Sequence, residues 1–158
     1  MTQTELAIRD FRPGDEAAFR SLNEEWIIQY FAVEPKEAAL LADPQGTILD
    51  RGGRIFFATH DSQTVGCCAL LVIAPNEFEV AKMAVTESYR RLGIGRRLLE
   101  KAIAEARVLG ARRLYLETNR KLVGAIRLYE SLGFRHLPPE RVVPSVYARA
   151  DVYMELCL

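Results

Sequence analysis

Two regular segments in the middle of this chain are joined by the stretch Arg90-Arg91-Leu92-Gly93-Ile94-Gly95. The largely apolar residues 80–85 precede it and suit a strand, and residues 96–109 follow it with the spacing of an amphipathic helix. Glycines between a strand and a helix let the backbone approach an anion, and the helix N-terminus offers free N–H groups and a partial positive charge. The junction therefore predicts a phosphate-binding turn.

Charge is unevenly distributed along the chain although the net charge is zero. Residues 82–127 carry 12 of the 21 Lys and Arg side chains with only four acidic residues, whereas residues 1–81 carry six basic and 13 acidic ones. A basic centre around a phosphate-binding turn suits a polyanionic cofactor. Nucleic acid is the rival partner for these arginines, but the chain as a whole is neutral and no aromatic residues are interleaved with them. We therefore expect no nucleic-acid partner.

Length and composition indicate one globular domain over residues 1–158, with 49% hydrophobic and 27% charged residues. The longest apolar run, residues 65–74, is too short to span a bilayer, and the N-terminus lacks the apolar segment of a signal peptide. Three cysteines, of which Cys67 and Cys68 are adjacent, do not suggest a disulfide framework. We expect a cytoplasmic protein with no membrane contact.

The periodicity predicts strands and helices in a mixed order. Strands are expected at residues 6–11, 54–59, 64–74, 78–85, 113–117, 134–137 and 152–156. Helices are expected at residues 16–30, 35–41, 94–109 and 123–132. Asp15 is the expected cap of the first helix, and residues 43–46 and 138–150 are expected to be loops. The three consecutive strands are most simply antiparallel, so the fold class is mixed α/β.

With these elements placed, two motifs resemble the GNAT superfamily of N-acetyltransferases. Residues 81–99 carry that family's acetyl-CoA pattern, in which Gln or Arg is followed after two residues by Gly and after one more by Gly or Ala; here these are Arg90, Gly93 and Gly95. Residues 125–134 resemble its second cofactor-side motif. The resemblance covers roughly the second half of the chain. It implies a central, mostly antiparallel twisted sheet with a splayed parallel strand pair, flanked by about four helices, and acetyl-CoA as the cosubstrate.

The resemblance also implies which residues bind that cosubstrate. The pyrophosphate would lie on the turn formed by Arg90, Arg91, Leu92, Gly93, Ile94, Gly95 and Arg96. The strand edge at Met83, Ala84 and Val85 would hydrogen-bond the pantetheine arm as if a strand were added. Two positions depart from the family pattern: Arg91 stands where Gly is common, and Leu122 stands where Asn is common, which leaves Asn119 as a candidate substitute.

Two further residues would carry the chemistry. Tyr129 falls where many members keep a tyrosine that protonates the departing thiolate, and Glu79 matches the general base of the histone-acetylating members. An amine with a pKa of about 10.4 must lose a proton before it attacks, and a carboxylate, or a water that it orients, can accept that proton. The residues alone leave non-catalytic roles open, since Glu79 could face solvent and Tyr129 could be a core tyrosine. No metal is expected, because His60 and His136 lack partners at ligand spacing.

The expected activity is therefore acetyl transfer to a primary amine of a small molecule or peptide, and the alternative is a non-catalytic coenzyme A-binding sensor. The acidic first half of the chain favours a cationic acceptor. Candidate residues for the acceptor pocket are Tyr30, Phe31, Tyr147 and Arg149. Trp26 is a further candidate, but packing is its favoured role. A sheet edge near the C-terminus could pair two copies into a homodimer.

Overall fold

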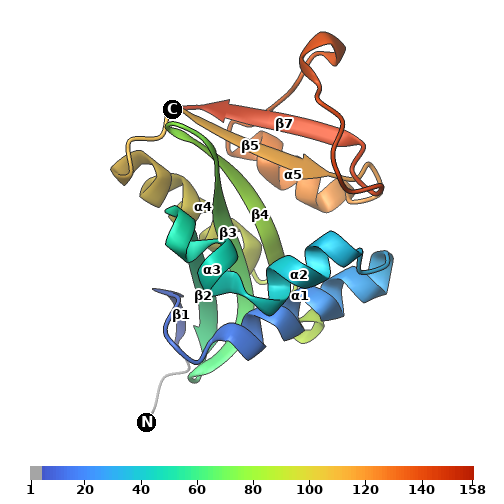
Figure 1. Cartoon of the computed structure of the whole chain (residues 1–158). Helices are drawn as coiled ribbons and strands as arrows, with labels where there is room; N and C mark the ends of the chain where they lie inside the picture. The colour runs from blue at the N-terminus through green and yellow to red at the C-terminus, as the bar shows by residue number, and fades with distance from the viewer. Residues whose placement is uncertain (1–4) are drawn as a thin grey trace.

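A seven-stranded sheet forms the centre of the computed structural model, which describes residues 5–158 (Figure 1). Its strands are β1 (Leu6–Asp10), β2 (Arg54–His60), β3 (Gln63–Ala74), β4 (Glu77–Val85), β5 (Arg113–Thr118), β6 (Arg135–His136) and β7 (Val152–Cys157). They lie in the order β1-β2-β3-β4-β5-β7-β6, and every neighbouring pair is antiparallel except β4 and β5. The expected mixed α/β fold is confirmed.

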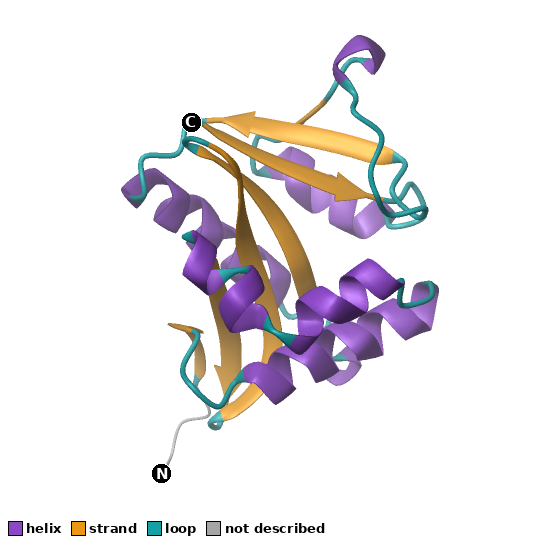
Figure 2. Ribbon diagram, viewed as in Figure 1, coloured by secondary structure: helices purple, strands orange, loops and turns teal. Residues whose placement is uncertain are grey.

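Helices cover both faces of the sheet (Figure 2). They are α1 (Glu16–Tyr30), α2 (Pro35–Ala42), α3 (Pro44–Thr47), α4 (Ile94–Val108) and α5 (Val123–Ser131). Three short 3₁₀ turns add η1 (Leu49–Arg51), η2 (Glu87–Tyr89) and η3 (Pro139–Arg141). Within residues 5–158, none of the helices has the length and apolar character that crossing a membrane requires.

The sheet separates two hydrophobic cores. One core packs α1 and α2 against one face through Phe19, Ile27 and Leu41, and the other packs α4 and α5 against the opposite face. Successive side chains of a strand point to opposite faces, so adjacent residues contribute to different cores. Cys67 accordingly lies in the α1 core and Cys68 in the α4 core, and both are buried as free thiols.

The parallel pair β4–β5 is short, and this shortness creates the space for a site. Its register joins only residues 77–79 to residues 113–115, after which the two strands diverge (Figure 1). Strand β4 also contains a bulge opposite β3, where the pairing shifts between Cys67 and Ala69 and Lys82 adopts a φ of +55°. A bulge bends its strand and increases the local twist. The open edge of β4 therefore faces a gap between the two halves of the sheet.

One local expectation was wrong and two were correct only in part. Residues 43–46 belong largely to α3, because Pro44 starts the turn and the Asp43 carboxylate accepts a hydrogen bond from the Gly46 N–H at 3.0 Å. Asp15 occupies the N-cap position of α1 as expected, but its carboxylate makes no capping hydrogen bond and pairs with Arg9 at 2.7 Å instead. The strand expected at residues 134–137 is only two residues long, and Pro138 just beyond it has no N–H to continue a ladder.

Candidate active site

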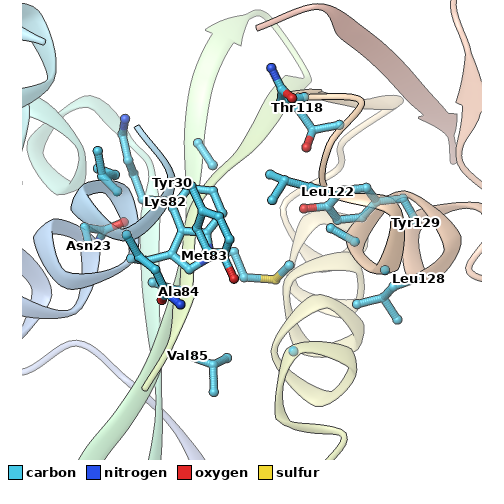
Figure 3. A pocket seen from close by; sticks show the side chains of 18 of the residues that line it. Asn23, Tyr30, Lys82, Met83, Ala84, Val85, Thr118, Leu122, Leu128 and Tyr129 are labelled. Carbon is cyan, nitrogen blue, oxygen red and sulfur yellow. The ribbon is translucent and has the colours of Figure 1, made fainter. Parts of the chain in front are cut away.

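A cavity of about 1010 Å³ lies in the gap between the two halves of the sheet. Its walls come from α1, the open edge of β4, the turn before α4, the end of β5, α5 and the loop that precedes β7. Figure 3 shows Tyr30, Lys82 and Met83 on one side of this cavity and Thr118, Leu122 and Tyr129 on the other. Residues that are distant in the sequence thus share one cavity.

The predicted phosphate-binding turn forms one end of the cavity. Arg91 and Gly93 both have left-handed backbone, with φ values of +67° and +76°, and α4 begins at Ile94. A left-handed residue other than glycine costs about 1–2 kcal/mol, so the position that Arg91 occupies is one that favours glycine. A Cβ built on Gly95 would meet only Leu128 Cδ2, at 3.8 Å. The first turn of α4 therefore presents free N–H groups to an open cradle that suits a phosphate.

Arg90 has a different role from the rest of this turn. Its Nε donates to the Val85 carbonyl oxygen at 2.9 Å, and its Nη1 donates to Gln29 Oε1 at 2.7 Å. The side chain therefore joins the end of β4 to α1. Its buried Nη2 has no hydrogen-bond partner among residues 5–158.

The edge of β4 offers backbone groups to the cavity. The Thr86 N–H donates to the Val65 carbonyl oxygen at 2.8 Å, so Thr86 faces β3. Because successive residues of a strand alternate in direction, Val85 and Met83 direct their N–H and C=O groups to the open side, whereas Ala84 pairs with Cys67 of β3. Met83 and the Val85 N–H are thus placed to hydrogen-bond an extended ligand, since the Val85 carbonyl oxygen already accepts from Arg90 Nε. Ala84 forms the wall between them.

Tyr129 lies on α5 with its hydroxyl directed into the cavity (Figure 3). Its ring packs against Phe134, with the ring centroids 6.0 Å apart. Burial, and then the proximity of Cys68, raises the pKa of the Tyr129 hydroxyl above its ordinary value. The hydroxyl therefore stays protonated at neutral pH and can serve as a proton donor.

Glu79 lies on β4 and lines the cavity, and it pairs with Tyr115 of β5 in the parallel register. Burial, and then the negative charge of Glu117, raise its pKa to about 7, while Lys82 acts in the opposite direction. A carboxyl group with this pKa is poised to exchange a proton near neutral pH. The alternative that Glu79 faces bulk solvent is excluded, because the residue is half-buried and lines the cavity.

Glu117 is a second carboxylate at the same end of the cavity, and the sequence reading missed it. Its two oxygens accept hydrogen bonds from the Tyr115 hydroxyl at 2.8 Å and the Ser145 hydroxyl at 2.6 Å. Residues 115 and 117 share one face of β5, and residue 115 pairs with Glu79. The signal that could have found Glu117 is this alternation, once the parallel register of β4 and β5 is known.

A buried ion cluster, also missed, closes the cavity on the side of α2. The Glu37 carboxylate, which is fully buried, accepts from Lys82 Nζ at 2.6 Å and from Arg149 Nη1 at 2.8 Å. Burial opposes ionisation of Glu37, but the hydrogen bonds and charges of Arg149 and Lys82 outweigh it and hold the Glu37 pKa below its ordinary value. The cluster ties α2, the β4 bulge and the loop before β7 together.

Asn119 lines the cavity, but its side chain is already engaged. Its Nδ2 donates to the Arg149 carbonyl oxygen at 2.7 Å, and its Oδ1 accepts from the Lys121 N–H at 2.9 Å. Leu122 adds an apolar side chain to the same wall. Asn119 therefore shapes the cavity through the backbone that it holds. Within residues 5–158, no group of three His, Cys, Asp or Glu side chains is arranged to hold a metal ion.

Comparison with known proteins agrees with this geometry. The model of the acetyltransferase (GNAT) family matches residues 16–134. The uncharacterized N-acetyltransferase YvbK of Bacillus subtilis is 33% identical over 99 residues, which cover 61% of this chain and 64% of that protein. The ribosomal protein bS18-alanine N-acetyltransferase of Escherichia coli is 37% identical over 84 residues, which cover 52% of this chain and 57% of that protein. Each match thus spans less than two thirds of the relative's length.

A solved structure shows the same fold. The acetyltransferase yncA from Salmonella typhimurium, determined with its cofactor acetyl-CoA, superposes with a TM-score of 0.76 at 21% sequence identity. The superposition covers 98% of this chain and 94% of that chain. The fold described above is therefore shared with a protein whose structure contains acetyl-CoA.

Proposed function

The chain belongs to the acetyltransferase (GNAT) family, and from this premise we propose that it transfers an acetyl group from acetyl-CoA to a primary amine by direct attack. One observation carries the proposal. Glu79 and Tyr129 face the same cavity from opposite walls, one with a pKa near neutrality and one that stays protonated. Two titratable groups whose environments suit opposite proton transfers are the mark of an acid–base pair.

Cofactor binding would use the two backbone features of the cavity. The N–H groups at the start of α4, with Arg91 and Arg96 around them, would hold the pyrophosphate. The Leu92 side chain is exposed and does not line the cavity. Met83 and Val85 would hydrogen-bond the pantetheine arm along the open edge of β4. When bound, acetyl-CoA supplies a thioester carbonyl that an amine can attack.

The catalytic steps would then divide between the two walls. Glu79, or a water that it orients, would take a proton from the incoming ammonium so that the nitrogen can form its bond to the carbonyl carbon. A backbone N–H of β4 near Val85 would stabilise the negative charge that develops on the carbonyl oxygen. Tyr129 would give its proton to the sulfur as the carbon–sulfur bond breaks. Free coenzyme A and an N-acetylated amine would leave the cavity.

Thiol release from acetyl-CoA tests this function. We would measure it across a panel of amines, amino acids and peptides, including a peptide with an N-terminal alanine because one relative is a ribosomal protein bS18-alanine N-acetyltransferase. Tyr129→Phe should lower kcat by about 100-fold or more, the usual contribution of a general acid. Stabilisation of the variant by acetyl-CoA should persist, since the phosphate turn and the β4 edge are unchanged.

The same assay separates the enzyme from the sensor. Turnover with one class of amine, reduced in Tyr129→Phe, would establish the enzyme. Turnover that is unchanged in the variant would remove Tyr129 from the mechanism. Binding of acetyl-CoA without thiol release above background, with every amine of the panel, would favour the coenzyme A-binding sensor.

A further inference from the structure

The end of the cavity that holds Glu79 and Glu117, the acceptor end, has a charge pattern that would select among amines. We propose that the acceptor carries a second positive charge, which Glu117 binds, and that the aromatic side chains of α1 cover the carbon chain between the two nitrogens. The acceptor class is then an alkyl diamine or polyamine rather than an amino acid. This inference rests on the proposed function and specifies its substrate.

The two ends of the cavity differ in charge. Around the phosphate turn the lining contains the basic residues Arg90, Arg91 and Arg96. At the opposite end, Glu79 and Glu117 approach the same space from β4 and β5. An anionic cofactor arm and a cationic acceptor would therefore each meet the opposite charge.

The cations at the acceptor end are already paired. Lys82 and Arg149 line this end, but their side chains are only 6% and 18% exposed and both bind the buried carboxylate of Glu37. Arg149 also lies 3.5 Å from Glu34. A carboxylate on the acceptor would have to compete with two protein carboxylates for these groups. The pattern therefore disfavours an acceptor with a free α-carboxylate.

Glu117 is held in place but not saturated. A carboxylate offers about four acceptor positions, and the hydroxyls of Tyr115 and Ser145 occupy two of them. These two bonds fix the carboxylate against β5 and the loop before β7, so little side-chain entropy remains to be lost when a cation binds. Glu117 is thus preorganised for an ammonium group.

An aromatic cluster at the end of α1 provides the opposite wall. The ring centroid of Trp26 lies 5.5 Å from that of Tyr30 and 6.1 Å from that of Phe31, and all three residues line the cavity. Aromatic faces attract cations and also cover methylene groups. The last turn of α1 contains no basic residue, so the negative end of the helix dipole adds to this preference.

The decisive experiment compares matched amines. Isothermal titration calorimetry on the protein saturated with coenzyme A would measure the binding of 1,3-diaminopropane, 1,5-diaminopentane, pentylamine and lysine. Pentylamine lacks the second charge of 1,5-diaminopentane, and lysine adds a carboxylate to it. At least one diamine should bind about tenfold more tightly than pentylamine or lysine. Glu117→Gln should abolish this difference.

Glu25→Gln is the control variant, because it removes one negative charge from an exposed site on α1 outside the cavity. It should retain the preference for the diamine. Should Glu117→Gln fail to fold, the comparison of the four amines on the unmodified protein still decides the question. Equal affinity for pentylamine and both diamines, or tighter binding of lysine, would overturn the inference.

Thiol release with the same amines separates the two proposals. Selective diamine binding without any thiol release would refute acetyl transfer and leave the diamine site intact. Thiol release that is equally efficient with monoamines and diamines would refute the diamine site and leave acetyl transfer intact.

Discussion

At the residue scale, the proposed mechanism makes Glu79 the group that sets the pH dependence of the whole reaction. Its folded environment holds its pKa at about 7, and it must be ionised to accept a proton from the acceptor. We predict that kcat/KM rises as the pH increases through about 7 and then levels until the acceptor or Tyr129 titrates. Glu79→Gln should remove this rise and lower kcat/KM by about 100-fold or more. A pH profile of thiol release checks both statements, and an unchanged profile in the variant would assign the base to another group.

The ionised carboxylate of Glu79 should also lower the free energy of unfolding at alkaline pH. A folded pKa of about 7 against an ordinary value of 4.5 means that folding disfavours the charged carboxylate. The contribution of protonated Glu79 is thus fully present below about pH 4.5 and is lost as the pH rises to 7. The loss amounts to roughly 3 kcal/mol, from about 1.4 kcal/mol per pKa unit.

Thermal unfolding reveals this cost. Glu79→Gln should melt several degrees above the unmodified protein at pH 8 and show a much smaller difference at pH 4.5. The exposed control Glu25→Gln should follow the unmodified protein at both pH values. A difference that is the same at pH 4.5 and pH 8 would mean that Glu79 is not desolvated in the folded state.

At the scale of elements, the cluster of Glu37, Lys82 and Arg149 holds three segments in register. Removal of one partner from a buried ion cluster leaves uncompensated charge and typically costs about 3–5 kcal/mol. Glu37→Gln should therefore reduce the free energy of unfolding by about this amount in urea titrations. Glu24→Gln is the comparison, because Glu24 pairs with Arg20 on the surface of α1 and such pairs contribute less than about 1 kcal/mol. Similar effects of the two substitutions would show that the cluster contributes no more than a surface pair.

The elements also show what a sequence can and cannot predict. The bounds of α1 were predicted to the residue, because the apolar spacing of a long helix is a local property. Helix α3 was missed because four residues containing Pro and Gly resemble a turn. The bulge at Lys82 had no local signal, since the ion cluster around it includes a carboxylate 45 positions away. Contacts of this kind depend on the fold that brings them together.

Across the whole molecule, the two ends of the cavity differ in how far the sequence predicts them. The phosphate turn is one continuous stretch, so its glycines and the helix that follows were visible in the sequence. The acceptor end combines Glu117 of β5, Ser145 of the last loop and Trp26 of α1, which meet only after the sheet has formed. The aromatic residues and Arg149 were predicted as candidates there, but the carboxylates Glu37 and Glu117 were not. A site assembled from distant segments leaves no motif.

Because the cavity lies between the two halves of the sheet, coenzyme A should tie them together. The open edge of β4 has no strand partner beyond residue 79, so its outward amides depend on a ligand for protection from exchange. We predict that coenzyme A slows hydrogen exchange in residues 80–85 and in the first turn of α4, with little change in β1 and β2. Mass spectrometry of peptides with and without coenzyme A would measure this.

Two variants at Gly95 make that experiment specific. Gly95→Ala adds a methyl group that meets only Leu128 Cδ2 at 3.8 Å, so the fold and the protection should persist. Gly95→Glu places a negative charge in the phosphate cradle, and both the protection and the thermal stabilisation by coenzyme A should disappear. Protection that survives Gly95→Glu, or that spreads evenly over β1 and β2, would place coenzyme A elsewhere. A loss confined to Gly95→Glu would show that the turn at the start of α4 anchors the ligand along β4.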